Sequence, residues 1–285
     1  MNNIKSKKHR TTLTVLLIIL LASAIWVYWG NISIQITHIG INSKKIPIAF
    51  NGFRIVQVSD LHNAEFGDNQ SKLLRAIKAA SPDLIAVTGD LIDSRHTDVE
   101  KAMDFIEGAL DIAQVYFVSG NHEARTDKYA ELKERMMESG VILLEDESAT
   151  IKFSGDTIRL LGLKDLDFSG IFRENTVMID TKLKDMRDES GKYTVLLSHR
   201  PELFEVYTAN GIDLVLSGHA HGGQVRLPFV GGLVAPNQGF FPKYSEGVYE
   251  KQQTKMIVSR GLGNSIVPVR LNNRPELVMI TFVSV

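Results

Sequence analysis

Short, almost wholly apolar runs alternate with amphipathic stretches over the first half of the chain. Residues 53–59 (FRIVQVS) predict a strand, residues 71–80 a helix with one apolar face, and residues 84–87 a second strand. The same rhythm continues with a helix at 99–110, a strand at 115–118 and a helix at 128–139 that ends at Gly140. This alternation is typical of an α/β fold.

The pattern changes after Val141, where short apolar strands predominate. Apolar stretches on either side of the turn residues 154–156 predict a hairpin over 150–161. The remaining predicted elements are strands at 193–197, 214–217, 256–259 and 277–283 and a helix at 202–209. A layered α/β domain with two sheets and outer helices accommodates this set of elements.

A continuous apolar segment near the N-terminus stands apart from these elements. Residues 11–29 contain no charged side chain, and this length is about that needed to cross a bilayer. Trp26, Tyr28 and Trp29 close the segment, as aromatic residues do at a membrane interface. The basic cluster that precedes it consists of Lys5, Lys7, Lys8 and Arg10. Because such clusters stay cytoplasmic, we expect a single-pass protein of the cell membrane with its globular part outside the cytoplasm.

Two other interpretations of this segment are a signal peptide cleaved near Ala22, Ser23 and Ala24 and a buried core helix. An uncleaved anchor is favoured, because the apolar character continues past Ala24 and the basic flank is one-sided. We therefore divide the chain into a basic tip and anchor (1–30), a short connector with a possible first strand (31–52) and a catalytic domain (53–285).

Composition narrows the classes of function. The 285 residues carry a net charge of -1, and without the four residues of the basic cluster that charge becomes -5, which argues against a nucleic-acid partner. The chain contains no cysteine, which excludes disulfides, thiolate metal sites and cysteine nucleophiles. Any metal must therefore bind nitrogen and oxygen ligands, and no obligate protein partner is evident.

Five of the predicted strands end in residues that can bind metal ions. In chain order these are Asp60 and His62, then Asp90, then Asn121, His122 and Glu123, then His199, and finally His219 and His221. The crevice beyond the carboxyl ends of strands is where α/β sheets bind ligands, so we expect the five groups to converge. Each group alone is weak evidence for a metal site, since Asp and Gly-Asn are common in turns. Their coincidence at five strand ends favours a metal site.

The spacing within the groups has a structural interpretation. Residues two apart in an extended segment project the same way, which we expect for Asp60 with His62 and for His219 with His221. Glycines before Asp90, Asn121 and His219 are expected to provide tight or left-handed turns.

The motifs SDLH, GDLID, GNHE and SGHAHGGQ, in this order, resemble those of the calcineurin-like metallophosphoesterases, and especially of their membrane-associated bacterial branch. The resemblance runs from about Phe53 to the C-terminus and implies a four-layer α-β-β-α sandwich. It implies one metal held by Asp60, His62, Asp90 and His221 and a second held by Asp90, Asn121, His199 and His219, with Asp90 bridging. It also implies a bridging hydroxide as nucleophile and His122 as general acid or phosphoryl donor, with Glu123 as a possible orienting partner.

The resemblance leads us to expect metal-dependent hydrolysis of a phosphate ester, as a phosphodiester or diphosphate bond, on a lipid-linked or nucleotide substrate. The alternatives are a broad phosphodiesterase or phosphomonoesterase of small molecules, and a non-catalytic scaffold of the same fold. A metallopeptidase is disfavoured, because it would need another ligand order. Two divalent or trivalent ions are expected, and the nitrogen and oxygen ligands suit manganese, iron, zinc or nickel.

Several other residues have weaker signals. Asp213 is either a residue that orients a ligand histidine or a turn residue, and Asp93 and His96 are expected in a solvated loop rather than in the cleft. We expect His38 to be structural. Residues 236–244 are expected to form a loop, in which the rings of Phe240, Phe241 and Tyr244 either pack into the core or line the cleft.

Overall fold

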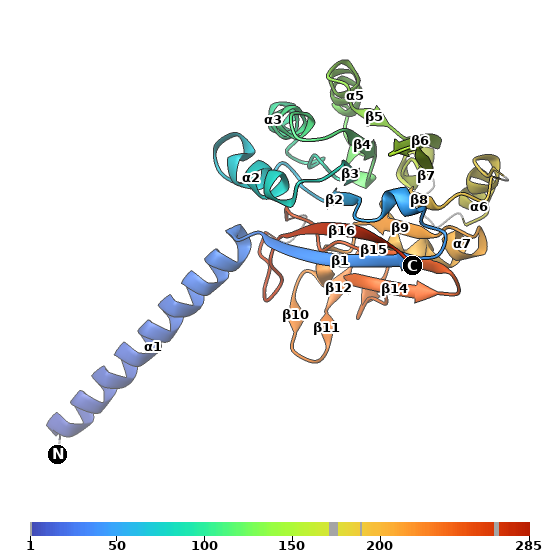
Figure 1. The fold of residues 1–285 in the computed structure, drawn as a ribbon. Helices are drawn as coiled ribbons and strands as arrows, with labels where there is room; N and C mark the ends of the chain where they lie inside the picture. Colours follow the sequence, from blue (N-terminus) through green and yellow to red (C-terminus); the bar gives the residue numbers. More distant parts are fainter. Residues whose placement is uncertain (1, 171–175, 189, 265–267) are drawn as a thin grey trace.

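The computed structural model describes residues 2–170, 176–188, 190–264 and 268–285, with side chains described from residue 11 onward. Two six-stranded sheets form its centre (Figure 1). The first has the strand order β1-β16-β2-β3-β4-β5. Its strands are β1 (Gln35–Ser43), β2 (Arg54–Val58), β3 (Leu84–Thr88), β4 (Val115–Val118), β5 (Ile142–Leu143) and β16 (Glu276–Ser284). β2 to β5 are parallel, and β16 runs antiparallel to β2.

The second sheet has the order β14-β15-β9-β8-β7-β6. Its strands are β6 (Glu147–Phe153), β7 (Asp156–Gly162), β8 (Thr194–Leu197), β9 (Leu214–Ser217), β14 (Gly247–Lys251) and β15 (Thr254–Val258). β7, β8, β9 and β15 are parallel, whereas β6 and β14 pair antiparallel at the two edges. Two short ladders pair β10 (Arg226–Leu227) with β11 (Gly231–Gly232) and β12 (Val234–Ala235) with β13 (Gly239–Phe240).

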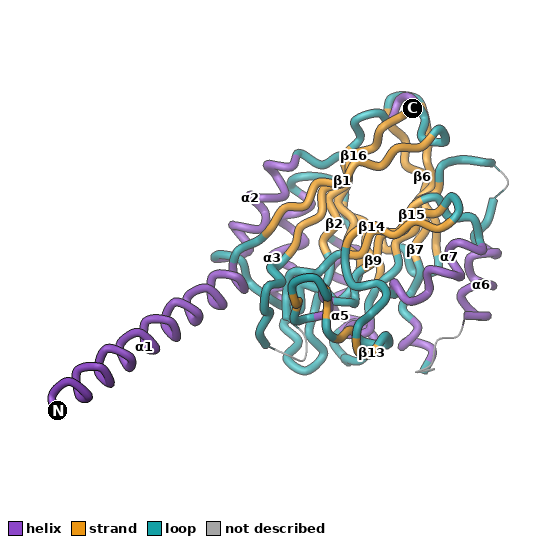
Figure 2. The backbone as a smooth tube through the Cα atoms, turned by 90° about the horizontal axis from the view of Figure 1, so that it is seen from below, coloured by secondary structure: helices purple, strands orange, loops and turns teal. Residues whose placement is uncertain are grey.

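Helices cover the outer face of each sheet, as the view along the layers shows (Figure 2). The first sheet packs against α2 (Ser71–Ala80), α3 (Val99–Leu110) and α5 (Tyr129–Glu138), and the second against α6 (Thr176–Asp185) and α7 (Phe204–Ala209). A third apolar cluster, which includes Val118, Leu197 and Ile280, joins the facing surfaces of the two sheets. Because apolar side chains fill both faces of each sheet, the predicted four-layer α-β-β-α sandwich is confirmed.

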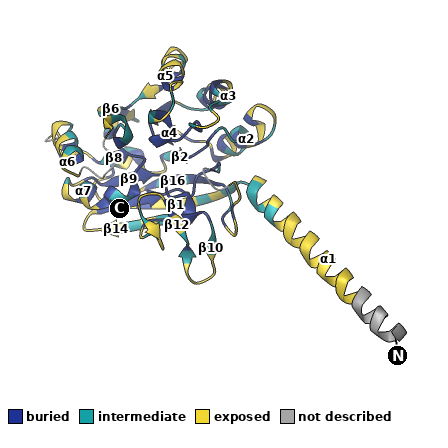
Figure 3. Ribbon diagram, turned by 180° about the vertical axis from the view of Figure 1, so that it is seen from behind, coloured by how far each residue is buried: buried dark blue, intermediate teal, exposed yellow. Residues whose placement is uncertain are grey.

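Helix α1 (Asn2–Ile32) extends away from these layers and is exposed along most of its described length (Figure 3). Its segment Thr11–Ile32 is long and apolar enough to span a bilayer, and none of it is buried. The alternative interpretation as a core helix is therefore wrong. The side chains of the basic cluster at residues 5–10 lie outside the described part of the chain.

The predicted elements agree with the observed ones to within a few residues. The helix predicted at 202–209 is divided, because Pro201 begins a 3-10 turn (Pro201–Leu203) that leads into α7. The possible strand in the predicted connector exists as β1, which pairs along its whole length with β16. Only Ser33 and Ile34 separate α1 from β1, so the apolar helix leads almost directly into the first sheet.

Candidate metal centre

All seven predicted ligands are buried beyond the carboxyl ends of strands from both sheets. Asp60 and His62 follow β2, Asp90 follows β3, and Asn121 begins the short helix α4 (Asn121–Ala124) after β4. His199 follows β8, and His219 and His221 follow β9. These strands are adjacent in their own sheets, and the sheets face one another, so side chains distant in sequence converge.

The backbone at these positions differs from the extended segments that we expected. Asp60, His62, Asp90, His219 and His221 have φ values of 51°, 47°, 53°, 66° and 48°. Non-glycine residues rarely adopt this left-handed conformation, and clusters of them are typical of functional sites. The paired side chains therefore converge because the chain turns sharply after each strand, and the prediction of a shared extended face is wrong.

Of the three glycines before the ligands, one has the predicted left-handed backbone. Gly89 has a φ of 90°, which agrees with a left-handed turn. Gly120 has a φ of -106°, and a Cβ atom there would lie 2.3 Å from Oδ1 of Asp90. A Cβ atom on Gly218 would lie 1.9 Å from Oγ of Ser59. These two glycines therefore allow close approach between neighbouring turns.

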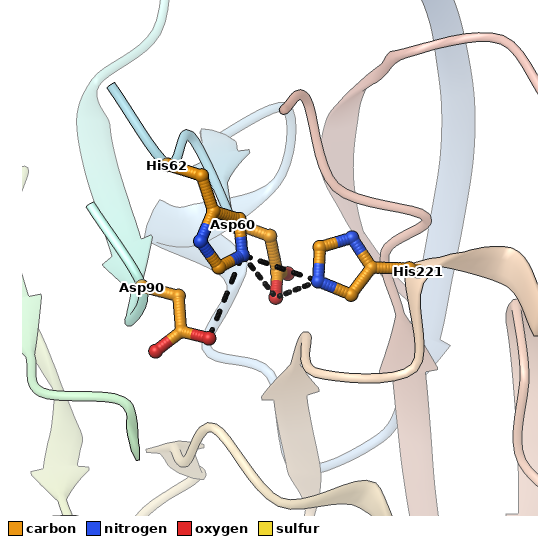
Figure 4. A group of neighbouring side chains, drawn as sticks. All are labelled: Asp60, His62, Asp90 and His221. Carbon is orange, nitrogen blue, oxygen red and sulfur yellow. Dashed lines mark hydrogen bonds and ion pairs between the residues drawn. The ribbon is translucent and has the colours of Figure 1, made fainter. Parts of the chain in front are cut away.

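Asp60, His62, Asp90 and His221 form the first group of converging ligand atoms (Figure 4). Each residue offers one nitrogen or oxygen atom, and these atoms lie within 4.8 Å of one another. Nε2 of His62 and Nε2 of His221 are 3.1 Å apart, and Nε2 of His221 is 3.4 Å from Oδ1 of Asp60.

The second group consists of Asp90, His199 and His219. Nε2 of His199 lies 3.1 Å from Oδ2 of Asp90 and 3.1 Å from Nδ1 of His219. The amide of Asn121 adjoins this group, at 2.8 Å from Nδ1 of His219. Asp90 belongs to both groups, as the bridging assignment requires.

Three of the four ligand histidines are held in the neutral form that can bind a metal ion, whereas His199 favours the protonated form. Burial lowers the pKa of His62 to about 3 and holds the pKa of His219 and His221 well below its usual value, so these rings are neutral. Burial raises the pKa of Asp60 to about 6. Burial alone would lower the pKa of His199, but the adjacent Asp90 carboxylate raises it to about 10.

The chemistry of the donor set provides the test of fit. The two groups combine imidazole nitrogens with the carboxylates of Asp60 and Asp90, and the neutral side-chain amide of Asn121 lies beside them. These nitrogen and oxygen donors are those that divalent metals bind.

The arrangement agrees with comparisons to known proteins. The chain matches the model of the calcineurin-like phosphoesterases over residues 53–223. The chain belongs to this family. It is 31% identical over 259 residues to YkuE of Bacillus subtilis (strain 168), an uncharacterized metallophosphoesterase, and the aligned region covers 88% of this chain and 86% of YkuE. It is 28% identical over 237 residues to the phosphodiesterase YaeI of Escherichia coli (strain K12), and the aligned region covers 81% of this chain and 82% of YaeI.

Among solved structures, TT1561 of Thermus thermophilus has a TM-score of 0.52 and 11% sequence identity, covering 74% of this chain and 90% of that one. This likeness shows a common fold. The predicted family is thus confirmed from the sequence relatives, and the chain is a metallophosphoesterase with a buried cluster of His and Asp side chains.

His122, the predicted catalytic residue of this phosphoesterase, is buried beside the first group, with its ring centre 4.4 Å from that of His62. The backbone N–H of Ser94 donates to Nδ1 of His122 at 3.0 Å. Because Nδ1 accepts this bond, the neutral ring carries its proton on Nε2. Burial lowers the pKa of His122, which favours the neutral form.

Glu123 does not orient His122, contrary to the possible role proposed from the sequence. Its buried carboxylate accepts the backbone N–H groups of Gly120 at 2.7 Å, Asp90 at 2.8 Å and Ile92 at 3.2 Å. Glu123 therefore ties the turn after β3 to the turn after β4. The sequence contained a signal for this role, because a Glu three residues after a helix N-cap commonly accepts backbone N–H bonds.

Two buried arginines near the paired histidines had no role in the sequence analysis. Nη1 of Arg200 lies 3.4 Å from Nε2 of His219, and Nη2 of Arg270 lies 3.3 Å from Nδ1 of His221. After burial, which has the largest effect, the positive charges of these arginines help to lower the pKa of the two histidines. Arg200 directly follows His199 and could have been considered, whereas the position of Arg270 gave no signal.

The weaker sequence signals have mixed outcomes. Asp93 is buried in a bidentate pair with Arg95. Its Oδ2 also lies 3.9 Å from Nδ1 of both His62 and His122. The prediction of a solvated loop is therefore wrong for this residue. His96 is exposed, and together with His62 and Asp93 it lines a cleft of about 620 Å³.

Asp213 does not orient a ligand histidine. It begins the turn into β9 at the end opposite the metal centre, where it binds Nζ of Lys45 at 2.8 Å and accepts the N–H of Thr194 at 2.9 Å. His38 is exposed on β1. Tyr244 is 5% exposed and packs into the core, whereas Phe240 and Phe241 are 80% and 65% exposed, so core packing holds only for the tyrosine.

Proposed function

We propose that this chain hydrolyses phosphodiester or diphosphate bonds at a centre of two metal ions. The observation that carries the proposal is the pair of buried ligand groups that share Asp90. One ion would be held by Asp60, His62, Asp90 and His221, and the other by Asp90, Asn121, His199 and His219. Two ions bound there would act as Lewis acids and stabilise the negative charge of the phosphoryl group. They would also acidify a bridging water, and the resulting hydroxide would act as the nucleophile.

Protein side chains supply the remaining requirements of the reaction. The Nε2–H of His122 is the proposed proton donor to the departing alkoxide or hydrogen-bond donor to a phosphoryl oxygen. Arg95 and Lys101 line the cleft beside His62. Arg95 is paired with Asp93, and Lys101 lies near Glu65 and Asp98, so a substrate phosphate would have to share these cations with carboxylates. The same set of groups disfavours a non-catalytic scaffold, because all predicted ligands and His122 are present.

The substrate is proposed to be lipid-linked, with the catalytic domain outside the cytoplasm. Support comes from the two-residue connection between α1 and β1 and from Pro268, which lines both the cleft beside His62 and the groove along α1. If α1 spans the bilayer, the domain is held close to the membrane surface, where lipid-linked molecules are concentrated. The phosphodiesterase name of the relative YaeI supports a diester or diphosphate rather than a monoester.

The decisive experiment measures turnover by the full chain in lipid nanodiscs, loaded in turn with manganese, iron, zinc or nickel. Substrates should include monoesters, diesters, and a lipid-bearing diphosphate beside its water-soluble headgroup analogue. We expect no turnover after chelation and a higher kcat/KM for the lipid-bearing substrate. Full turnover with metal absence verified by elemental analysis would refute the metal mechanism, and equal kcat/KM for the soluble analogue would refute the lipid-linked substrate.

A further inference from the structure

A hollow of about 230 Å³ lies where the end of α1 meets the loop before β16. One wall consists of Trp26, Val27, Trp29 and Gly30 of α1, and the other includes Arg260, Arg270, Asn272 and Arg274. No acidic residue lines it in the described part of the chain. We call this hollow the junction pocket.

The junction pocket has an excess of positive charge. Arg260 is neutralised by Glu276, at 3.1 Å, and by Glu246, which also pairs with Arg226. Among the described residues, Arg270 and Arg274 form no ion pair with a carboxylate: Arg270 donates to the carbonyl oxygens of Arg260 and Gly263 and to Oδ1 of Asn264. Arg270 is buried and its guanidinium faces His221, so the guanidinium charge left for a ligand at this pocket is that of Arg274, which favours an anionic ligand.

The two walls of the pocket are fixed to each other. Asn31 of α1 accepts the backbone N–H of Arg270 at 2.8 Å and donates to its carbonyl at 3.0 Å. Arg274 donates through Nε and Nη2 to the carbonyls of Ser33 and Ile34 and to Oγ of Ser33, and its guanidinium lies 4.7 Å from the ring centre of Trp29. These bonds use three of the five N–H groups of Arg274 and leave Nη1 for a ligand.

An apolar groove of about 530 Å³ adjoins the junction pocket and shares Val27 with it. On α1 the groove is lined by Leu20, Ser23, Ala24 and Val27, which have the spacing of one helix face, and Pro268 and Val269 line the other side. The two sites match the two parts of a phospholipid. The basic hollow lies at the level of the interfacial tryptophans, where a headgroup phosphate would lie, and the apolar groove runs along the span, where an acyl chain would lie.

We propose that the junction pocket binds the phosphate of an anionic phospholipid, whose acyl chain lies in the apolar groove along α1. This site lies outside the metal centre, with the buried Arg270 between the two, and it requires that α1 lie in the bilayer. The groove selects a lipid over free phosphate, because inorganic phosphate would leave the apolar surface unused. Binding would hold the catalytic domain at a fixed height and angle over the membrane.

The test uses the full chain in a neutral detergent and measures lipid binding by native mass spectrometry, which requires no turnover. Phosphatidylglycerol should bind at least several-fold more tightly than phosphatidylcholine with the same acyl chains. Arg274→Gln should weaken phosphatidylglycerol binding about fivefold, and Asn272→Asp, which adds a negative charge at an exposed left-handed position, should do the same.

Matched controls separate the pocket from general charge effects. Asn69→Asp makes the same change at another exposed left-handed asparagine, and Lys72→Gln removes a cation near the end of α1 outside the pocket; both should bind phosphatidylglycerol as the parent chain does. Equal affinity for the two lipids, or equal losses in Asn272→Asp and Asn69→Asp, would overturn the proposal. Displacement of the lipid by equimolar inorganic phosphate would show a free-phosphate site instead. The metal centre is untouched by these variants, so failure here leaves the hydrolase proposal standing.

Discussion

Replacing Glu123 with alanine should loosen two of the ligand-bearing turns at once. The carboxylate is fully buried and accepts three backbone N–H groups, from Gly120, Asp90 and Ile92. Alanine leaves these three buried donors without their acceptor. The turn after β3 carries Asp90, so we expect its carboxylate to shift and both metal ions to bind more weakly.

The magnitude follows from the number of orphaned donors. A buried donor left unsatisfied costs about 1–3 kcal/mol, so three donors give a loss of about 3–6 kcal/mol when partial relaxation is allowed. That loss is a large share of an ordinary unfolding free energy of about 5–15 kcal/mol. Glu123→Gln should lose less, about 1–3 kcal/mol, because the Gly120 and Asp90 donors share Oε2 and one amide oxygen can accept both.

The assay is urea unfolding of the full chain in a mild detergent, followed by circular dichroism, together with metal content from elemental analysis. Glu107→Ala, at an exposed position on α3, is the matched control and should change the unfolding free energy by less than about 0.5 kcal/mol. If Glu123→Ala unfolds like the control and retains two metal ions, Glu123 does not brace the turns.

Four other predictions concern the metal centre and the anchor. Asp90→Ala should remove both metal ions in elemental analysis, and retention of one tightly bound ion would contradict a bridging role. His122→Ala should keep both ions but lower turnover about 10²- to 10⁴-fold, with a smaller loss on nitrophenyl esters if the residue is an acid; equal losses across leaving groups would favour the phosphoryl-donor role. Metal affinity should fall with decreasing pH, because protons compete with the metal at His199, whose pKa is about 10. Below about pH 6 protons also compete at Asp60, so isothermal titration should show a steeper pH dependence of the affinity below pH 6 than above it. Reporter fusions at the C-terminus should be active only when exported, and a signal from a cytoplasm-dependent reporter would reverse the proposed orientation.

The sequence was sufficient to predict which side chains converge, but not how the backbone achieves it. The strand ends are visible because apolar runs such as 214–217 stop at Gly-His or Gly-Asp, and parallel strands place their ends together. The left-handed conformations of Asp60, His62 and His221 could not be predicted, because these residue types prefer other regions. Tertiary contacts hold them there.

Residues that act through long-range contacts were also beyond the sequence analysis. From the sequence, Asp213 is either a ligand-orienting residue or a turn residue, and only the direction of β9, which places it at the opposite end of the sheet from His219, decides for the turn. Arg270 reaches His221 from a distant loop that has no motif of its own. Such pairings depend on how the two sheets face each other, which local patterns do not determine.

The pairing of β1 with β16 has a consequence for how the chain is made. β1 emerges directly after the apolar helix, but its only neighbour in the first sheet is the last described strand. During synthesis β1 therefore has no strand to pair with in this sheet until almost all of the catalytic domain has been translated. Long-range strand pairing of this kind folds slowly and leaves an exposed edge open to association with other chains. Biogenesis of this protein should thus depend on holding the newly made domain apart from its neighbours until β16 arrives.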